Sequence, residues 1–508
     1  MVSAVATIMG KIFAVGGDKE ILQLSDSKTR VVNLHGATVL PGFIDSHTHL
    51  YSYGLSFQLI DFRKFRTLNS ALRAVKRKAE TLKRGEWLLG RGWDKNNWSL
   101  DDFPHKSDLD AICKNPCAFS SHDGHSIWVN SSALKLANIN NSTHNPRGGV
   151  IKKDADGEPS GILFEEAVGL IENAIPQRTF SNKMKALLIA QKNAFKVGVT
   201  SVCDFDEDKD KYRMLETASL SGKLKLKVLC GVRREDFDNE DIKGFISGFG
   251  NEKLRIGHLK LFADGALGSQ TAEMFEPYSG SKNYGVGVLS EKELKKYFRK
   301  AAEMGLSVAV HSIGDKANHK VIRAFLSISV KYGNNIPNRI EHLQLIRDED
   351  IPLLKSSGII ASMQPSHILA DRDTADKYWG ERSKGAYPFK SLIKNGITIC
   401  FGSDAPIEDM NPLEGIYAAV NRHRPGDGRG AWYPDERLSI REAVEGFTVN
   451  AARGVGAESS LGKLKPGYMA DMVILSDDIF KRDKTDLHLI TVLATISDGY
   501  FRYDKGGF

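Results

Sequence analysis

Two histidines stand two residues apart in the run Pro41-Gly-Phe-Ile-Asp-Ser-His-Thr-His-Leu50. His47 and His49 follow an apolar segment that is typical of a buried strand, and side chains two apart on a strand point to the same face. Two imidazoles placed in this way can bind one metal ion. The pair alone is weak support for a metal site, because histidines at this spacing also occur as surface or structural residues.

Three further polar residues strengthen this hypothesis. His311, His342 and Asp404 each end a run that is expected to be a strand, and the runs before His311 and Asp404 are largely apolar. Parallel strands of a barrel bring their carboxyl ends to one face, and barrels hold their active sites there. Four imidazoles and a carboxylate on that face suit zinc or another borderline divalent ion. We therefore predict that these three residues join His47 and His49 in one metal site.

Lys260 lies inside the apolar run 257–264. An ammonium group buried beside a metal site is unfavourable, both because it loses its hydration and because like charges repel. Carboxylation by carbon dioxide would convert it into an anionic carbamate that can bridge two metal ions about 3.5–4 Å apart. The alternative is a lysine whose ammonium extends to the barrel edge. Asp264 and His258 are competing candidates nearby.

The elements that must position these side chains alternate along the chain. Nearly continuous apolar runs are typical of parallel strands buried on both faces, and helical patterns lie between most of them. Eight such strands with crossover helices predict an α/β protein with a (β/α)8 TIM-type barrel over residues 42–454. The expected strands are 42–45, 200–204, 225–231, 255–262, 307–311, 339–342, 359–362 and 397–402.

The two ends of the chain and one internal stretch depart from this alternation. Short β-like runs broken by turn residues predict one small β-sandwich domain built from residues 1–41 and 455–508. Residues 85–178 predict an insertion after the first barrel strand that covers the barrel mouth as a lid. Its tryptophans either line an apolar pocket or form the core of the insertion; they are Trp87, Trp93, Trp98 and Trp128.

Composition excludes several classes of protein. The 70 Lys and Arg residues exceed the 63 Asp and Glu residues by only 7 over 508 residues, without a basic block, so nucleic-acid binding is not expected. The five cysteines are odd in number and scattered, which favours free thiols in a reducing compartment; Cys113 and Cys117 lack the spacing of a zinc knuckle. Neither a signal peptide nor an apolar run of about 18 residues is present, so we expect a cytoplasmic protein without a membrane partner.

Several motifs together resemble the amidohydrolase superfamily. They are PGFIDSHTHL, HSIGD from His311, the pair Glu341-His342, GSDA at 402–405 and GKLKPGYMAD at 462–471. The resemblance covers nearly the whole chain and implies a metal-dependent hydrolase of carbon–nitrogen bonds other than peptide bonds. The segments 121–134 and 260–265 are similar, more narrowly, to the branch that includes N-substituted formamide deformylases.

The resemblance also implies a ligand set for one or two zinc ions. That set is His47, His49, Lys260, His311, His342 and Asp404. The first two histidines would bind one ion together with Asp404, the other two histidines would bind a second ion, and the carboxylated lysine would bridge both. Asp404 would also act as general base and general acid.

Other polar residues are candidates for supporting roles. His122 or His125 in the insertion would hold a substrate carbonyl or oxyanion, and we take His125 as the catalytic one; each would otherwise be an ordinary hydrogen-bonded loop histidine. Asp315 and Glu341 are candidates for orienting the metal-binding imidazoles. The case for Glu341 is weaker, because it should point away from the neighbouring His342 on a strand.

These features predict hydrolysis of a small linear amide, an N-formyl or N-acyl amine. Metal-activated hydroxide would attack the carbonyl, and Asp404 would protonate the departing amine. Alternatives on the same site are a cyclic amide, an ester or an N-acyl amino acid. A catalytically silent regulatory relative should lack a metal ligand, and here every expected position is filled.

Two further expectations rest on the resemblance alone. It allows a homodimer, since dimers are common in the superfamily. Family members usually begin with one more β-strand than this chain has before Val15, so either the β-domain is trimmed or Met1 is not the true start.

Overall fold

The computed structural model describes residues 2–121, 125–328 and 336–508. The chain forms two compact units. One comprises Met1–Tyr53 together with Leu187–Phe508, and the other is Gly54–Ala186. All the residues of the predicted metal site belong to the first unit, whereas the sequence range 85–178 falls within the second.

The first unit is built around a parallel sheet of eight strands that are neighbours in chain order. A parallel bridge between Thr48 and Ala405 brings the last strand back to the first, so the sheet closes into the predicted (β/α)8 barrel. Each of the eight expected runs forms a strand. The strands are β4 (Phe43–Thr48), β11 (Val199–Asp204), β12 (Lys227–Val232), β13 (Leu254–Phe262), β14 (Val308–Ser312), β15 (Arg339–His342), β16 (Ile360–Met363) and β17 (Ile399–Phe401).

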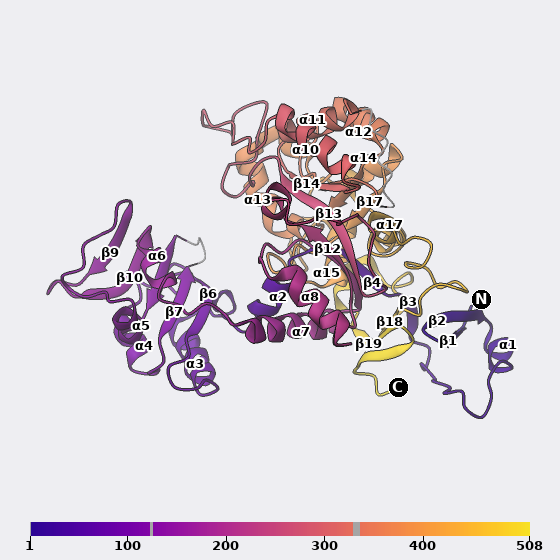
Figure 1. The fold of residues 1–508 in the computed structure, drawn as a ribbon, viewed down its shortest axis with the longest axis horizontal. Coiled ribbons are helices and arrows are strands. Elements are labelled where there is room, and N and C mark those ends of the chain that lie inside the picture. The colour runs from indigo at the N-terminus through magenta and orange to yellow at the C-terminus, as the bar shows by residue number, and fades with distance from the viewer. Residues whose placement is uncertain (1, 122–124, 329–335) are drawn as a thin grey trace. The chain divides into compact units, whose positions relative to one another are not determined.

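Helices follow the strands and surround the sheet (Figure 1). In α10, Ser290 and Glu293 cap the first turn reciprocally, while Leu294, Phe298 and Ala301 form its buried face. Two helices cross the bounds of this unit, α2 (Leu50–Ser56) and α7 (Phe180–Lys196). The helices within it are α8 (Lys211–Leu220), α9 (Arg234–Asp238), α10 (Glu291–Glu303), α11 (Asp315–Leu326), α12 (Ile351–Ser357), α13 (His367–Trp379), α14 (Phe389–Lys394), α15 (Pro412–Asn421), α16 (Ile440–Gly446) and α17 (Val449–Gly454).

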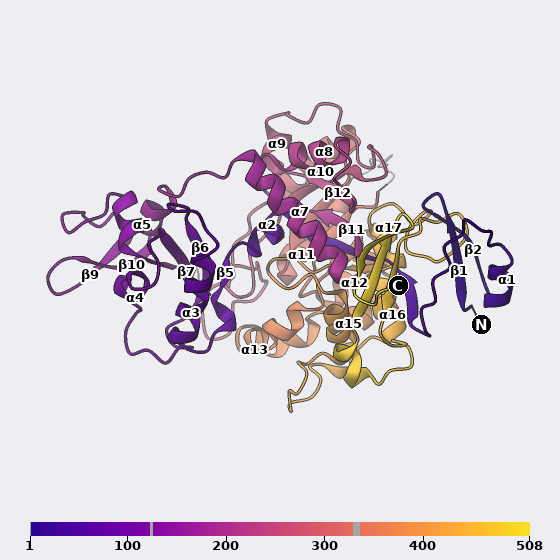
Figure 2. The same ribbon diagram turned by 90° about the horizontal axis from the view of Figure 1, so that it is seen from below.

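Both ends of the chain contribute to antiparallel sheets beside the barrel (Figure 2). One sheet has the strand order β20-β19-β18-β3, and the other is the hairpin β1-β2. Ile12 of the hairpin packs in one apolar core with Met472 and Ile496 of the larger sheet. The elements are β1 (Ala4–Ile8), β2 (Lys11–Gly16), α1 (Asp18–Leu22), β3 (Thr38–Pro41), β18 (Met472–Leu475), β19 (Val492–Ser497) and β20 (Tyr500–Asp504).

The second unit contains a mixed six-stranded sheet with the order β5-β6-β7-β8-β10-β9. Trp93, Trp98 and Trp128 are buried together in its core, so these three tryptophans stabilise the unit. The elements are β5 (Ile60–Asp61), α3 (Leu68–Ala79), β6 (Leu88–Trp93), α4 (Lys106–Asp110), β7 (Cys117–Ser121), β8 (Ser126–Val129), α5 (Ser131–Leu136), β9 (Gly149–Lys153), β10 (Pro159–Glu165) and α6 (Val168–Glu172).

In the three described segments, no helix combines the length and the apolar composition that crossing a bilayer requires.

Candidate metal centre

The first two histidines lie where the first barrel strand ends. His47 is the fifth residue of β4 and is buried, and His49 follows the strand and is half-buried. The carboxylate of Asp45 fixes this strand end, because it accepts hydrogen bonds from the backbone N–H groups of His47 (3.1 Å) and Ser403 (3.0 Å) and from the Ser403 hydroxyl (2.5 Å). Asp45 therefore ties the first strand to the segment after the last strand and brings the histidines to Asp404.

Asp404 lies at the centre of the cluster. Its Oδ1 is 3.1 Å from Nε2 of His49 and 3.5 Å from Nε2 of His47, and its backbone N–H donates to the carbonyl oxygen of His47 (2.7 Å). Its φ of +59° is a strained backbone conformation for a residue with a side chain. Because the surrounding hydrogen bonds hold this conformation, the carboxylate has a fixed position among the imidazoles.

The remaining two histidines extend the cluster across the barrel. The ring centroids of His47 and His342 are 5.0 Å apart, and those of His342 and His311 are 4.5 Å apart. Ligand atoms of His47, His342 and Asp404 lie within 4.8 Å of one another, so these three can hold one ion. The structure thus brings the predicted histidines of three segments, together with Asp404 from a fourth, to one face of the barrel.

Hydrogen bonds orient two of the imidazoles. Nδ1 of His47 donates to Oε2 of Glu341 (2.6 Å), which makes Nε2 the nitrogen that carries the lone pair and could bind a metal. Glu341 is itself held by Arg339 through a 2.8 Å ion pair, and both side chains are fully buried. Nε2 of His311 donates to the carbonyl oxygen of Gly265 (2.9 Å), which leaves Nδ1 as its possible ligand atom.

Electrostatics favour the ligating form of these groups. Burial, with Lys260 as the next cause, lowers the pKa of both His47 and His311 to about 4, and burial holds the pKa of His342 well below its usual range. The three imidazoles are therefore neutral near pH 7, which is the form that binds metals. Nδ1 of His342 is buried without a hydrogen-bond partner among the described residues. This donor set fits a divalent ion.

The contact between His49 and Asp404 favours the charged form of both groups. Burial opposes the charged form of each group, but the 3.1 Å contact raises the pKa of His49 and holds the pKa of Asp404 well below its usual range. Asp404 is therefore ionised near pH 7 and able to accept a proton.

Lys260 reaches this cluster from the interior of β13. Its Nζ is 3.3 Å from Nε2 of His47 and lies over the rings of Phe205 and Phe262, at 4.6 and 5.2 Å from their centroids. Among the described residues no carboxylate forms an ion pair with it, and burial lowers its pKa. A lowered pKa favours the neutral amine, which is the form that reacts with carbon dioxide.

The two competing candidates near Lys260 have other partners. Asp264 accepts hydrogen bonds from the backbone N–H groups of Ile313, Gly314 and Glu273 at 2.8–3.0 Å, so its carboxylate fixes loop structure behind His311. Nε2 of His258 hydrogen-bonds to the carbonyl oxygen of Pro337 (2.9 Å). Lys260 is therefore the better candidate for the centre.

Of the two residues expected to orient imidazoles, Glu341 contacts a histidine of the cluster and Asp315 bonds to backbone amides. Glu341 orients His47, and His342 beside it also reaches the centre because its φ of +74° breaks the strand alternation. The carboxylate of Asp315 instead accepts hydrogen bonds from the backbone N–H groups of Phe275 (3.0 Å) and Lys316 (2.8 Å), so the idea that it orients an imidazole gains no support.

The two insertion histidines belong to the second unit. His122 lies outside the described residues. His125 is exposed, and its Nδ1 is 3.1 Å from Oε2 of Glu165 within the same unit. Its catalytic role stays a prediction.

His367 is a member of the centre that sequence reasoning missed. It opens α13, four residues after the last residue of β16, and its Nε2 is 3.8 Å from Oδ2 of Asp404. Its ring stacks on His342, with centroids 6.1 Å apart and an interplanar angle of 17°. A search for histidines within five residues beyond each expected strand, instead of directly after it, would have found it.

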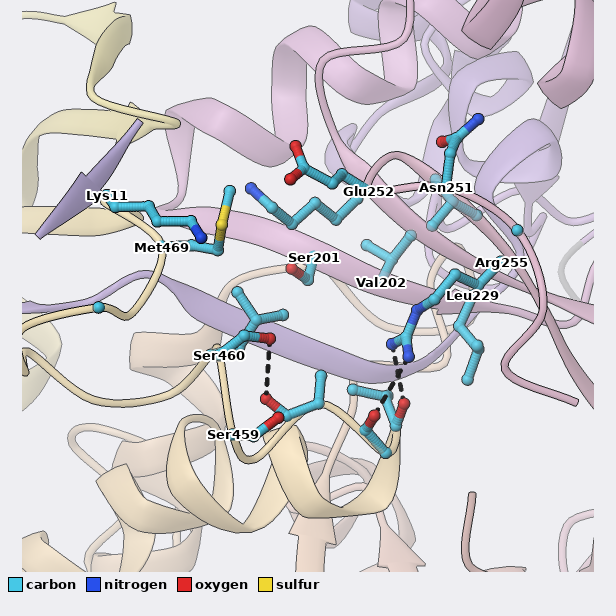
Figure 3. Close-up of a pocket in the computed structure, with 18 residues that line it drawn as sticks. Lys11, Ser201, Val202, Leu229, Asn251, Glu252, Arg255, Ser459, Ser460 and Met469 are labelled. Atoms are coloured by element: carbon cyan, nitrogen blue, oxygen red, sulfur yellow. Dashed lines mark hydrogen bonds between the residues drawn. The ribbon is translucent and has the colours of Figure 1, made fainter. Parts of the chain in front are cut away.

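A cavity of about 530 Å³ lies at the other end of the barrel, where β12 and β13 begin (Figure 3). The Arg255 guanidinium donates there to the carbonyl oxygens of Val455 (2.9 Å) and Gly456 (3.1 Å), just after α17. Because barrels of this type hold their active sites at the carboxyl ends of the strands, the metal centre and not this cavity is the candidate active site.

A (β/α)8 barrel with imidazoles and a carboxylate at the carboxyl ends of its strands can hold a metal ion where barrels of this type have their active sites. The chain belongs to the amidohydrolase family, which it matches over residues 30–503. It is 36% identical over 489 residues to the protein YtcJ of Bacillus subtilis (strain 168), covering 94% of this chain and 91% of that protein.

Two more distant comparisons add to this assignment. The chain is 26% identical over 520 residues to N-substituted formamide deformylase of Arthrobacter pascens, covering 99% of this chain and 95% of that enzyme. A crystal structure of an uncharacterized metal-dependent hydrolase from Pyrococcus horikoshii OT3 superposes with a TM-score of 0.77 at 30% identity, covering 94% of each chain.

Proposed function

We propose that this chain hydrolyses the carbon–nitrogen bond of a small linear amide, an N-formyl or N-acyl amine, with the help of one or two zinc ions. The observation that carries the proposal is the position of Asp404, whose Oδ1 faces two metal-binding histidines while its Oδ2 is turned to another side of the centre. The similarity to N-substituted formamide deformylase supports the class of bond.

The chain offers a complete set of groups to hold the metal. They are His47, His49, Lys260, His311, His342 and Asp404, all in the barrel unit. A bound zinc ion polarises the scissile carbonyl and lowers the pKa of water, so that a nucleophile is available near pH 7. The buried pair of Arg339 and Glu341 keeps His47 in the tautomer whose Nε2 can take part.

Asp404 moves the proton in this proposal. It is ionised near pH 7, so it can accept the proton that the attacking water loses. The same carboxyl group then donates this proton to the leaving nitrogen as the carbon–nitrogen bond breaks. No second proton carrier is required, because the proton gained in the first step is the one given up in the second.

Lys260 contributes to this proposal as a carbamate. In its neutral form Nζ would attack the carbon of carbon dioxide with its lone pair. A nitrogen–carbon bond forms, one carbon–oxygen π bond becomes a negatively charged oxygen, and the proton that leaves the nitrogen passes to water. The product replaces a buried amine by an anion beside neutral imidazoles, which is the charge that a pair of divalent ions would stabilise.

The experiment is amine release by zinc-loaded protein from a panel of N-formyl, N-acetyl and N-acyl amino acid compounds. Asp404→Asn serves as the blank, and Asp315→Asn is the matched control, because the carboxylate of Asp315 bonds to backbone amides outside the cluster. Release from N-formyl or N-acetyl compounds by the wild type and by Asp315→Asn alone supports the proposal. Absence of release from the whole panel by metal-loaded wild type would overturn it.

A further inference from the structure

We propose that His367 binds the substrate, by donating a hydrogen bond from Nε2 to the oxygen of the scissile carbonyl. This inference rests on the proposed function, because it assigns a contact to the substrate of the same site. His367 begins α13, and it stands on the face of the barrel where the strands end.

His367 is buried, yet in the described part of the chain nothing forms a hydrogen bond with its Nε2. The residue is 8% exposed, and its Nε2 has no hydrogen-bond partner among the described residues. The nearest carboxylate oxygen, Oδ2 of Asp404, is 3.8 Å away, which is too far for a hydrogen bond. A buried polar nitrogen without a partner is costly, so a native structure that retains one usually satisfies it with a ligand or with water.

Packing holds the imidazole in this orientation. The ring lies nearly parallel to that of His342, at an interplanar angle of 17°. His367 also begins a helix whose residues Ile368 and Trp379 are buried. The direction of Nε2 towards Asp404 is therefore fixed by the core, as a preorganised hydrogen-bond donor requires.

Each carboxylate oxygen of Asp404 faces a different set of histidines. Oδ1 faces His47 and His49, and Oδ2 faces His367. A leaving nitrogen that takes its proton from Oδ2 places the adjoining carbonyl group next to Nε2 of His367. The oxygen of that group becomes negatively charged in the transition state, and a donor aimed at it accelerates the reaction.

Two substitutions separate hydrogen bonding from packing. His367→Phe keeps an aromatic ring against His342 and removes the donor, while His367→Gln restores an N–H group near the position of Nε2. We expect His367→Phe to lower kcat about 100-fold with the zinc content of the wild type, and His367→Gln to recover most of that loss. Zinc content is measured by elemental analysis. Unchanged kcat in His367→Phe would overturn the inference, and loss of zinc would overturn it by assigning His367 to the metal.

A binding experiment tests the same donor without turnover. Methylphosphonate is a tetrahedral anion that resembles the transition state, and its affinity for each zinc-loaded protein is measured by calorimetry. We expect His367→Phe to bind it at least about 10-fold more weakly than the wild type and His367→Gln. Equal affinity, or no binding by the wild type, contradicts the inference. Weaker binding by His367→Phe together with no amine release by the wild type would leave His367 in the site and refute the substrate class.

Discussion

Two buried lysines lie on neighbouring strands of one barrel, and their surroundings are opposite. Nζ of Lys227 on β12 contacts Oδ1 and Oδ2 of Asp471 (2.9 and 2.7 Å) and Oδ1 of Asp498 (2.7 Å). Burial opposes its charge, but the two carboxylates outweigh burial and raise its pKa. Lys260 on β13 has imidazole and aromatic rings for neighbours, and burial lowers its pKa.

The difference shows how one fold assigns two roles to one residue type. A compensated lysine is a fixed cation, and Lys227 uses its charge to hold Asp471 and Asp498 of the terminal β-domain to the barrel. Burial without a paired carboxylate favours the neutral, nucleophilic form of a lysine, and this is the direction in which burial shifts the pKa of Lys260. We therefore expect substitutions at the Lys260 end of the barrel to change catalysis and substitutions at the Lys227 end to change stability.

The largest effect is expected at the catalytic end, from Asp404→Asn. The amide cannot accept and return a proton, so kcat should fall by about 10⁴-fold. Amine release is measured together with zinc content and the midpoint of thermal unfolding. We expect the variant to stay folded and to retain zinc; turnover at the wild-type rate would refute the role of Asp404.

Lys260→Met sharpens the comparison directly. Methionine is nearly as long as lysine and lacks the amine, so kcat should fall by about 10³-fold if a carbamate takes part. The free energy of unfolding of the metal-free protein should change by less than about 1 kcal/mol.

Carbon-13 NMR provides a second measurement for this variant. Wild-type protein equilibrated with ¹³C-labelled bicarbonate should show a carbamate resonance that Lys260→Met lacks and that Lys227→Met retains. A resonance of equal size in all three proteins would break the contrast between the two lysines.

Lys227→Met should act on stability. It leaves the carboxylates of Asp471 and Asp498 buried without their shared cation, so the free energy of unfolding should fall by about 3–5 kcal/mol. Urea denaturation measures this loss, and the kcat of the folded fraction should equal that of the wild type. A variant as stable as the wild type would show that the buried charge is not what joins these segments.

The smallest effect is expected from Asp498→Asn and depends on pH. Burial opposes the charge of Asp498, but Lys227 and Lys253 outweigh burial and lower its pKa from 3.8. The ionised carboxylate therefore adds to the free energy of unfolding above about pH 4, and this stabilisation is lost as the pH falls through the lower pKa of the folded protein. At pH 7 the variant should be less stable than the wild type by about 1 kcal/mol, since Asp471 still neutralises Lys227. Urea denaturation at pH 7, 5 and 3 should show this difference vanish at pH 3; a constant difference would exclude the charge as its cause.

Local spacing was enough to predict the barrel and most of the centre. The eight expected runs are strands. His47, His311 and His342 lie in the last residues of their strands and Asp404 lies just beyond its strand, and in a parallel barrel these carboxyl ends share one face. Contacts that depend on three-dimensional closure could not be predicted in this way. The hydrogen bond from His47 to Glu341 joins residues 294 apart, and His342 escapes the alternation rule through its backbone conformation.

The second unit shows another limit of the sequence. Its tryptophans were consistent with a pocket or with a core, because composition does not reveal which apolar side chains face one another. Burial of Trp93, Trp98 and Trp128 in one cluster favours the core. The lid function predicted for residues 85–178 and the role of His125 remain predictions.

The hydrogen bonds that Asp45 accepts from Ser403 join residues 358 positions apart in the chain. During translation the ribosome must therefore add most of the protein after the first two histidines before the carboxylate of Asp404 can meet them. Partial sets of imidazoles on a nascent chain bind divalent ions weakly, and without selection for geometry. We therefore expect the metal to bind the completed barrel and not the growing chain.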